Sequence, residues 1–403
     1  MLFALIVSCP VVFAACGGGS SSSSSSSSEP AEEAGGSSAE EAGSSGESET
    51  TADESGGSSD PAVAEAEEAV KVAEAPISEF NGPKTAPPIE PGKKVFVIDC
   101  SPETEGCQRL DESSMEGIKA IGWDGTLIHS DGSVPSFNSG IRQAINAGAE
   151  GIILSAIPTG VVAAPVKAAE EAGIPVVTTV AGEPEPKIGP EFKGGYYTNV
   201  DANNEELGKI AADWVIDQTQ GEAEVGAFIS PEFPVLVTRL ESFEKELENC
   251  SGCSMNGSSP VTVTGNTLIK DGPSNVTEFL RANPNVNYFF SAWDGGAAVA
   301  AQGIKASGTE VPMVSQEGNA PNLEMIREGG PEVAAVGTPL EWDGWAAVDQ
   351  MNRAFNHEQP APEWMPTGHG IPFQLLNEGN VPSTKTFTGE LEYQKEFEKL
   401  WGV

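Results

Sequence analysis

Residues 145–154 (INAGAEGIIL) and 164–177 (APVKAAEEAGIPVV) decide the fold of this 403-residue chain. Each stretch passes from an amphipathic helical pattern through a glycine, Gly148 or Gly173, into a short run of aliphatic residues. A short apolar run of this kind, set between amphipathic helices, is typical of a strand that is buried on both faces. The two stretches therefore predict successive helix–strand units of a parallel sheet covered by helices.

The same rhythm extends from residue 92 to the end of the chain. It pauses after residues 199–201 and then resumes, which predicts two Rossmann-like lobes of the α/β class. Roughly 310 residues also exceed one ordinary core and suit two domains. The expected strands are residues 95–98, 125–128, 151–154, 174–178, 224–230, 261–264, 288–290, 312–314, 333–336 and 373–376.

Residues 1–16 (MLFALIVSCPVVFAAC) have the pattern of an export signal. A short apolar core ends in small residues, and it is too short to span a bilayer. A cysteine directly after the small residues is typical of a lipoprotein signal, so we expect Cys16 to carry a lipid. The alternative is a buried N-terminal helix, which the composition of the residues that follow disfavours.

Residues 17–91 are rich in Ser, Gly, Glu and Pro, and we expect a disordered tether. Residues 62–75 are predicted to form at most a transient helix, because their apolar residues are mostly alanine. Such a tether would let a lipid-held domain clear a cell wall, or it would only solubilise the domain.

The charge of the chain excludes one class of partner. The formal net charge is -39, and nucleic acids require clusters of Lys and Arg. Beyond the signal no run of about 20 apolar residues occurs. We therefore expect no nucleic-acid partner, and membrane attachment only through Cys16.

Four cysteines remain after Cys9 and Cys16 are assigned to the signal and the lipid: Cys100, Cys107, Cys250 and Cys253. An even number in an exported chain indicates disulfides. We expect local bridges that join Cys100 to Cys107 and Cys250 to Cys253. The alternatives are a redox motif at 250–253, which would need its thiol at a helix N-terminus, and zinc, which would need both pairs to meet. We expect no metal.

Residues 145–154 and 164–177 resemble the type I periplasmic sugar-binding protein family of the ribose- and galactose-binding kind. Asp131-Gly132, residues 200–208 and residues 292–295 also fall in the order expected for that family. The resemblance covers residues 92–388. It implies a monomeric, extracytoplasmic receptor without a cofactor, which captures a small polar solute, with a sugar as the favoured class, and delivers it to an ABC permease. It also implies two lobes joined by a three-segment hinge, near Val200, Pro339 and Gln374. The first lobe would hold residues 92–200 and 340–374, and the second lobe residues 201–339 and 375–403.

The resemblance carries over to particular binding residues. Arg239 matches the arginine that clamps solute hydroxyls, although it also fits a surface charge on a helix. Trp293-Asp294 stands where the family has Asn-Asp, and Gln316-Glu317 stands where it has an acceptor carboxylate. Arginine forks suit hydroxyl, carboxylate or phosphate oxygens. We expect these side chains to converge on the solute, and we expect the removal of Arg239 to leave folding nearly unaffected.

The chain departs from the family at Thr179-Val180-Ala181, where many sugar binders carry Asp-Arg. We expect Thr179, and also Ser101 after the first strand, to line the cleft. Trp293 and Trp342 would supply flat stacking surfaces, unless they are core residues. The missing pair leaves room for an aromatic or purine-like solute.

No catalytic motif accompanies these residues. The chain has three histidines, well scattered, and no nucleophile beside a base. We therefore expect no enzymatic activity. The remaining alternative is a sensory receptor of the same fold that signals to a membrane kinase or a chemoreceptor.

Overall fold

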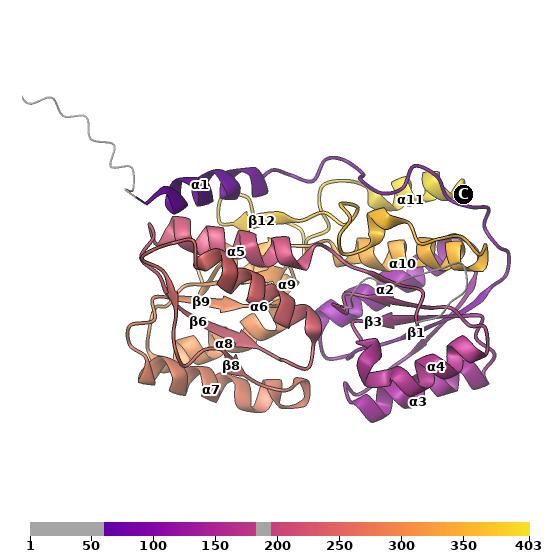
Figure 1. Cartoon of the computed structure of the whole chain (residues 1–403), viewed down its shortest axis with the longest axis horizontal. Coiled ribbons are helices and arrows are strands. Elements are labelled where there is room, and N and C mark those ends of the chain that lie inside the picture. The colour runs from indigo at the N-terminus through magenta and orange to yellow at the C-terminus, as the bar shows by residue number, and fades with distance from the viewer. Residues whose placement is uncertain (1–59, 183–194) are drawn as a thin grey trace, which may run out of the picture. The chain divides into compact units, whose positions relative to one another are not determined.

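The computed structural model describes residues 60–182 and 195–403, and Figure 1 shows how their helices and strands are arranged. Cys9, Cys16 and residues 17–59 of the expected tether lie outside the described residues. Within the described ranges no helix is both long enough and apolar enough to cross a membrane. The strands form two sheets, one in each half of the fold, and we call each sheet with its helices a lobe.

The sheet of the first lobe is entirely parallel, in the order β2-β1-β3-β4-β5. Its strands are β1 (Lys94–Ile98), β2 (Asp124–Ile128), β3 (Gly151–Ser155), β4 (Val176–Thr179) and β5 (Thr198–Val200). Alternate side chains of β1 enter two different cores. Phe96 and Ile98 pack in one core, and Val95 and Val97 pack in the other, as the two-residue period of a strand requires.

Helices therefore cover both faces of this sheet. They are α2 (Glu105–Ala120), α3 (Val134–Asn146), α4 (Ala163–Glu171) and α10 (Leu340–Phe355). Figure 1 shows α3 and α4 on one face of the sheet, and α10 packs against α2 on the other. The sequence prediction of a parallel α/β lobe is confirmed.

The sheet of the second lobe has the order β12-β11-β10-β9-β6-β7, with β8 paired to β6. All pairs are parallel except that of β11 with β12. Its strands are β6 (Glu224–Ile229), β7 (Ser254–Met255), β8 (Val261–Thr262), β9 (Tyr288–Ser291), β10 (Met313–Glu317), β11 (Glu332–Gly337) and β12 (Gln374–Asn377). Its helices are α5 (Asn204–Gln218), α6 (Pro234–Leu247), α7 (Leu268–Ala282), α8 (Asp294–Ser307) and α9 (Ala320–Arg327).

The chain passes between the lobes where the hinge was expected. It leaves β5 and enters α5 through residues 201–203, and it leaves β11 and enters α10 through residues 338–339. It returns from α10, through the short helix η3 (Pro362–Trp364), to β12. These connections place the carboxyl-terminal ends of both sheets beside the crossings.

The expected disorder of residues 17–91 does not extend to residues 60–91. Residues Pro61–Ala73 form helix α1, which Asp60 caps at its N-terminus and which packs against α5 (Figure 1). The helix buries Val63, Ala66 and Val70, at the i, i+3 and i+7 spacing of a single face. Val63 and Val70 add larger apolar side chains to the alanines, so the helix has one continuous face to bury against α5.

The segment after α1 runs along the first lobe. The indole Nε1 of Trp123 donates a hydrogen bond of 2.6 Å to the carbonyl of Glu90, and the Asn352 amide donates one of 3.1 Å to the carbonyl of Pro87. The ring of Phe80 lies 5.9 Å from that of Trp342. Residues 60–91 thus belong to the folded body and contact both lobes.

The assignment of all of residues 375–403 to the second lobe is also wrong. Strand β12 lies in the second sheet, but helix α11 (Tyr393–Trp401) packs against α10 of the first lobe. The indole of Trp401 stacks on that of Trp345 with centroids 5.3 Å apart, and its Nε1 donates to Asp349 Oδ1. The aromatic side chains of α11, Tyr393, Phe397 and Trp401, pack against Trp345 of α10. The spacing of these residues in the sequence does not show which element they contact.

Candidate ligand-binding site

Polar side chains gather where the strands of both sheets end. In the first lobe Asp99 follows β1, Thr179 ends β4 and Asp201 follows β5; in the second lobe Glu317 ends β10 and Thr338 follows β11. All five are buried. Open α/β sheets bind ligands outside the carboxyl ends of their strands, so these residues mark the candidate site.

Arg239 is fixed inside the second lobe. Its Nε donates a 2.7 Å hydrogen bond to Asn204 Oδ1 at the start of α5, and Nη1 donates a 2.9 Å bond to the carbonyl of Ala292. Nη1 also lies 3.4 Å from Glu317 Oε1, and the side chain is 1% exposed. Arg239 is therefore not a surface charge. Its burial contradicts the premise on which we expected folding to be indifferent to its removal, namely that a cleft residue is not part of a core.

Glu317 has the most constrained backbone of the site. Its φ angle is +116°, a region that a non-glycine residue adopts only under strain. Its Oε2 accepts a 3.2 Å hydrogen bond from Asn319 Nδ2. Burial raises the pKa of Glu317, and the opposing charges of Arg239 and Arg109 moderate that rise.

Asp294 supports the turn that carries Glu317. Its Oδ2 accepts hydrogen bonds from the backbone N–H groups of Gly318, at 2.8 Å, and Asn319, at 2.5 Å. Its Oδ1 accepts a 2.6 Å bond from Ser315 Oγ, which also contacts Glu332. Burial, followed by the charges of Glu332 and Glu317, raises the pKa of Asp294 well above its usual value. The structure thus places Asp294 behind Glu317, where it holds the turn.

The two tryptophans predicted for the site differ in their surroundings. Trp293 precedes α8 and is 8% exposed, and its indole stacks on Phe228 with centroids 5.6 Å apart. Trp342 is fully buried among Phe80 and Tyr393 and donates its indole N–H to the carbonyl of Thr388. The proposed role of Trp342 as a wall of the cleft is therefore wrong, because its ring belongs to a core beside α11.

The other predicted residues lie as follows. Both side-chain amide atoms of Gln316 and the hydroxyl of Thr179 are buried and have no hydrogen-bond partner. Ser101 is half-buried in the loop before α2, and its Oγ accepts a 3.4 Å bond from the backbone N–H of Glu103.

A pair of carboxyl groups, Asp99 and Asp111, occupies the site end of the first lobe. Ser155 Oγ, at the end of β3, donates a 2.5 Å hydrogen bond to Asp111 Oδ1. His129 Nδ1 lies 3.1 Å from Asp99 Oδ2. Burial, followed by the charge of Asp99, raises the pKa of Asp111 to about 8. Asp111 therefore keeps its proton at neutral pH.

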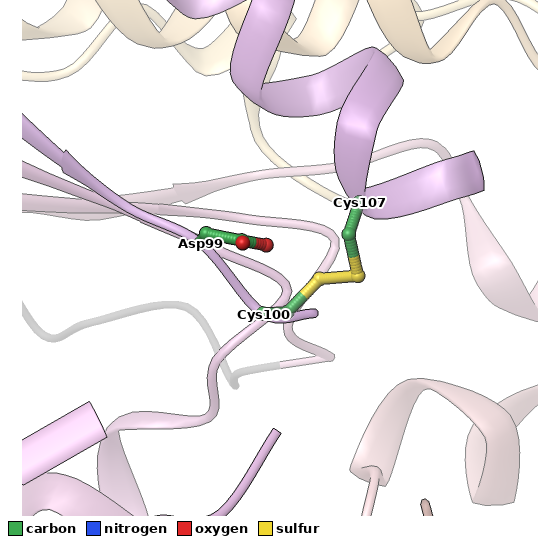
Figure 2. Close-up of side chains that lie close together, drawn as sticks. All are labelled: Asp99, Cys100 and Cys107. Atoms are coloured by element: carbon green, nitrogen blue, oxygen red, sulfur yellow. A yellow bond between two sulfur atoms is a disulfide. The ribbon is translucent and has the colours of Figure 1, made fainter. Parts of the chain in front are cut away.

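Figure 2 shows Asp99 beside the disulfide between Cys100 and Cys107. A carboxylate oxygen of Asp99 and the two sulfur atoms lie within 4.8 Å of one another. Zinc binds thiolates, and these two sulfurs are bonded to each other. The group is therefore a disulfide that ties β1 to α2, and not a metal centre in this state. Cys250 and Cys253 form the second disulfide, at the end of α6.

Two further carboxyl groups lie at the crossings. The pKa of Asp201 is raised to about 6 by burial, against the opposing charge of Arg239. Burial and then the charge of Asp201 raise the pKa of Asp343, in the first turn of α10, well above its usual value. One carboxylate oxygen of each residue is buried without a partner.

Sequence reasoning missed Asp99, Asp111, Asp201 and Asp343 as members of the site. Asp99 follows an expected strand and Asp201 lies at the expected crossing near Val200, so their position was a usable signal. Asp111 and Asp343 lie on helices, where no motif distinguishes them from surface acids.

Comparison with known proteins identifies the family. A family model described as a periplasmic binding protein domain matches residues 96–359. No curated protein matches the chain at a significant level.

Solved structures share this fold. An ABC sugar transporter subunit from Rhodobacter sphaeroides 2.4.1 is 20% identical with a TM-score of 0.62, over 72% of this chain and 99% of that chain. An ABC transporter solute-binding protein from Agrobacterium vitis, with bound allitol, is 19% identical with a TM-score of 0.62, over 72% and 97%. A glucose-galactose binding protein from Geobacillus stearothermophilus is 15% identical with a TM-score of 0.62, over 72% and 99%.

At such identities the likeness to solved structures establishes the fold, while the family model covers most of the chain. The family consists of solute-binding proteins, which are not enzymes. The chain belongs to the periplasmic binding protein family and has its type I fold of two α/β lobes.

Proposed function

We propose that this chain is an extracytoplasmic receptor that holds a small polar solute, a sugar or a related polyol, between its two lobes and delivers it to an ABC permease. One observation carries the proposal. Buried polar atoms without a hydrogen-bond partner gather at the strand ends and crossings of both lobes: Asp99 Oδ1, Thr179 Oγ1, Asp201 Oδ1, Gln316 Oε1 and Nε2, Thr338 Oγ1 and Asp343 Oδ1.

Buried polar groups in folded proteins are almost always paired. A solute that offers both donors and acceptors would satisfy this mixture of carboxylate, hydroxyl and amide atoms. The hydroxyl groups of a sugar or polyol do so. The related structures named above, which carry allitol or are described as sugar-binding, support the same class of solute.

Arg239 and Glu317 would contact the solute from the second lobe. The arginine has its Nη2 atom left for a further acceptor, since its Nε and Nη1 are engaged. Trp293, which stacks on Phe228, would present the edge of a rigid aromatic pair to an apolar face of the solute.

A thermal-shift screen tests the proposal. The panel contains allitol, D-tagatose, D-galactose, L-arabinose and glycerol, with adenosine and benzoate as an aromatic and purine-like arm. A solute present at a hundred times its dissociation constant stabilises the protein by about 2.7 kcal/mol. We expect at least one sugar or polyol to do so. A response to adenosine or benzoate alone would replace the proposed class of solute, and no response to any sugar or polyol would refute it.

Two neighbouring threonines supply a matched control. Thr179 Oγ1 has no partner, whereas Thr178 Oγ1 donates a 2.8 Å hydrogen bond to Asn199 Oδ1. Thr179→Val should therefore weaken solute binding without loss of stability. Thr178→Val should cost about 1 kcal/mol or more of stability, because it leaves the buried Asn199 oxygen short of a donor. Equal solute affinity of Thr179→Val and the parent would remove Thr179 from the site.

The lipid anchor at Cys16 and the role of the permease are part of the same proposal. The anchor is supported by the small residues before Cys16 and by the acidic segment that follows it. Detergent-phase partitioning of the full chain and of Cys16→Ser tests the anchor, and the variant should move to the aqueous phase. Delivery is tested by measuring uptake of the identified solute in cells from which this protein has been deleted. We expect uptake to fall, whereas deletion of a purely sensory receptor would leave it unchanged.

A further inference from the structure

Arg109, on α2 of the first lobe, joins the two lobes through a single guanidinium group. Its Nε and Nη2 donate to the two carboxylate oxygens of Glu341, at 2.9 and 2.8 Å, in the first turn of α10. Its Nη1 donates to Asn319 Oδ1 at 2.8 Å and to the carbonyl of Gly318 at 3.3 Å, both in the second lobe. Nη2 also donates to the carbonyl of Phe387 at 2.6 Å. The side chain is 5% exposed.

The contact continues from Asn319 into the candidate site. The amide oxygen of Asn319 accepts the hydrogen bond from Arg109 Nη1, and its Nδ2 donates a 3.2 Å hydrogen bond to Glu317 Oε2. Glu317 Oε1 in turn lies 3.4 Å from Arg239 Nη1. A continuous hydrogen-bonded chain therefore runs from Arg109 in the first lobe, through Asn319, to Glu317 and Arg239 in the second.

A second contact crosses between the lobes at the same place. Glu105, in the first turn of α2, accepts a 3.2 Å hydrogen bond from the backbone N–H of Ala320. The backbone N–H groups of Gly318 and Asn319, just before it, are held by Asp294. The turn at residues 317–320 is thus fixed from the second lobe by Asp294 and from the first lobe by α2.

We propose that Arg109 is a positioning residue for solute binding. It orients Asn319, and through Asn319 the carboxylate of Glu317, only while the lobes are in contact. The inference rests on the proposed function, because Glu317 is taken there to contact the solute. Separation of the lobes would break the bonds of Arg109 to Gly318 and Asn319 and leave its pair with Glu341, which lies in the first lobe. Closure of the two lobes would then also orient the carboxylate of Glu317.

The geometry requires arginine rather than a general positive charge. The hydrogen bonds to Glu341, Asn319 and Phe387 start from three different nitrogen atoms of the planar guanidinium fork of Arg109. A lysine ammonium has three donors on one nitrogen and cannot reproduce this fork. Arg109→Lys should therefore behave as a partial loss and not as a conservative change.

Amide hydrogen exchange of the solute-free protein tests the proposal without knowledge of the solute. In Arg109→Gln we expect the amides of residues 318–320 to exchange at least tenfold faster than in the parent, and in Arg109→Lys at an intermediate rate. Exchange in α7, within the same lobe, should not change. The matched control is Arg142→Gln on α3, an exposed arginine whose guanidinium contacts only the carbonyl of Asn138. Parental protection of residues 318–320 in Arg109→Gln would overturn the proposal.

Asn319→Ala keeps the experiment decisive if loss of the buried Arg109 charge prevents folding. It removes the same link from the second lobe and leaves the pair of Arg109 with Glu341 in place. We expect it to loosen residues 318–320 to a similar degree. Unchanged exchange in Asn319→Ala would show that the link does not hold the turn.

A double-mutant cycle with D-galactose as the probe separates positioning from simple stabilisation. Arg109→Gln and Glu317→Gln should each weaken binding about tenfold, and the double variant should bind no worse than Glu317→Gln alone, because the two residues act through one link. Additive losses would refute the link between them. Failure of D-galactose to bind the parent bears on the proposed function, and the exchange experiment then decides the role of Arg109 by itself.

Discussion

The two lobes hold their acidic residues at the site in opposite ways. In the second lobe, Glu317 faces the guanidinium of Arg239, and Asp294 accepts two backbone N–H groups. In the first lobe, Asp99 and Asp111 lie beside Ser155 and His129. The second lobe thus supplies fixed donors to Glu317 and Asp294, whereas in the first lobe burial, followed by the charge of Asp99, raises the pKa of Asp111 to about 8.

The difference follows from a single gap in the sequence. Thr179-Val180-Ala181 stands at the end of β4, where the resemblance led us to look for Asp-Arg, and Thr179 Oγ1 has no partner there. Within the described residues no Arg or Lys forms an ion pair with Asp99 or Asp111, whereas the buried Asp349 of the same lobe, on α10, pairs with Arg353. We infer that both lobes present unpaired polar groups to a solute, and that the second lobe also holds its Glu317 against the fixed guanidinium of Arg239.

The largest effect should follow from the removal of Arg239. Its loss removes the donor to Glu317 Oε1 and to Asn204 Oδ1, and leaves Glu317 the bond that Asn319 Nδ2 donates to Oε2. Breaking a buried ion pair by removal of one partner typically costs about 3–5 kcal/mol. We expect Arg239→Ala to lose about that much free energy of unfolding, measured by urea denaturation, and to bind the identified solute at least tenfold more weakly.

Lys245→Ala is the control for this variant. Lys245 is exposed on the same helix, α6, so its removal should change stability by no more than about 0.5 kcal/mol. Parental stability of Arg239→Ala would show that the second lobe does not depend on this pair, and the contrast between the lobes would fail.

The next effect is a pH dependence that belongs to the first lobe. The ordinary pKa of an aspartate is 3.8, and in the folded protein that of Asp111 is about 8. Between these values the folded state holds a proton that the unfolded state has lost, so stability is fully present below pH 3.8 and falls as the pH rises towards 8. The slope is about 1.4 kcal/mol per pH unit for one such group, or about 3 kcal/mol between pH 5 and 7.

Asp111→Asn should remove this slope, because asparagine mimics the protonated carboxyl group and does not titrate. Glu332 of the second lobe, whose pKa is about 7, titrates in the same direction in both proteins, so the variant should show a shallower dependence and not a flat one. Urea denaturation of parent and variant at pH 5, 6 and 7 measures the difference. Parallel curves would mean that the pKa of Asp111 is not raised in the folded protein.

Much of the fold could be predicted from the sequence, because the helix–strand rhythm around residues 145–177 is local. Arg239 and Glu317 were named from the resemblance to the family, and the structure brings Arg239 Nη1 to 3.4 Å from Glu317 Oε1, while their contact with the solute stays a prediction. Trp342 follows a strand as well, but its ring lies among Phe80 and Tyr393, which come from segments remote in the chain. Arg109 carried no signal, because its role depends on contact between two lobes that the sequence does not juxtapose.

The smallest effect concerns α1, which packs against α5 of the second lobe. Composition alone predicts that this segment is part of a disordered tether. Val70 and Val72 lie on the same helix, and they are 6% and 66% exposed. Removal of two buried methyl groups costs about 1.5 kcal/mol, whereas removal of exposed ones costs almost nothing and exchanges valine for a better helix former. We therefore expect Val70→Ala to lower the free energy of unfolding by about 1.5 kcal/mol and Val72→Ala to leave it unchanged or slightly raised.

Both variants should bind the solute like the parent, because α1 packs on α5. If the two variants have the same stability, α1 is not part of the folded second lobe, and the tether must be extended to residue 91 as its composition first suggested.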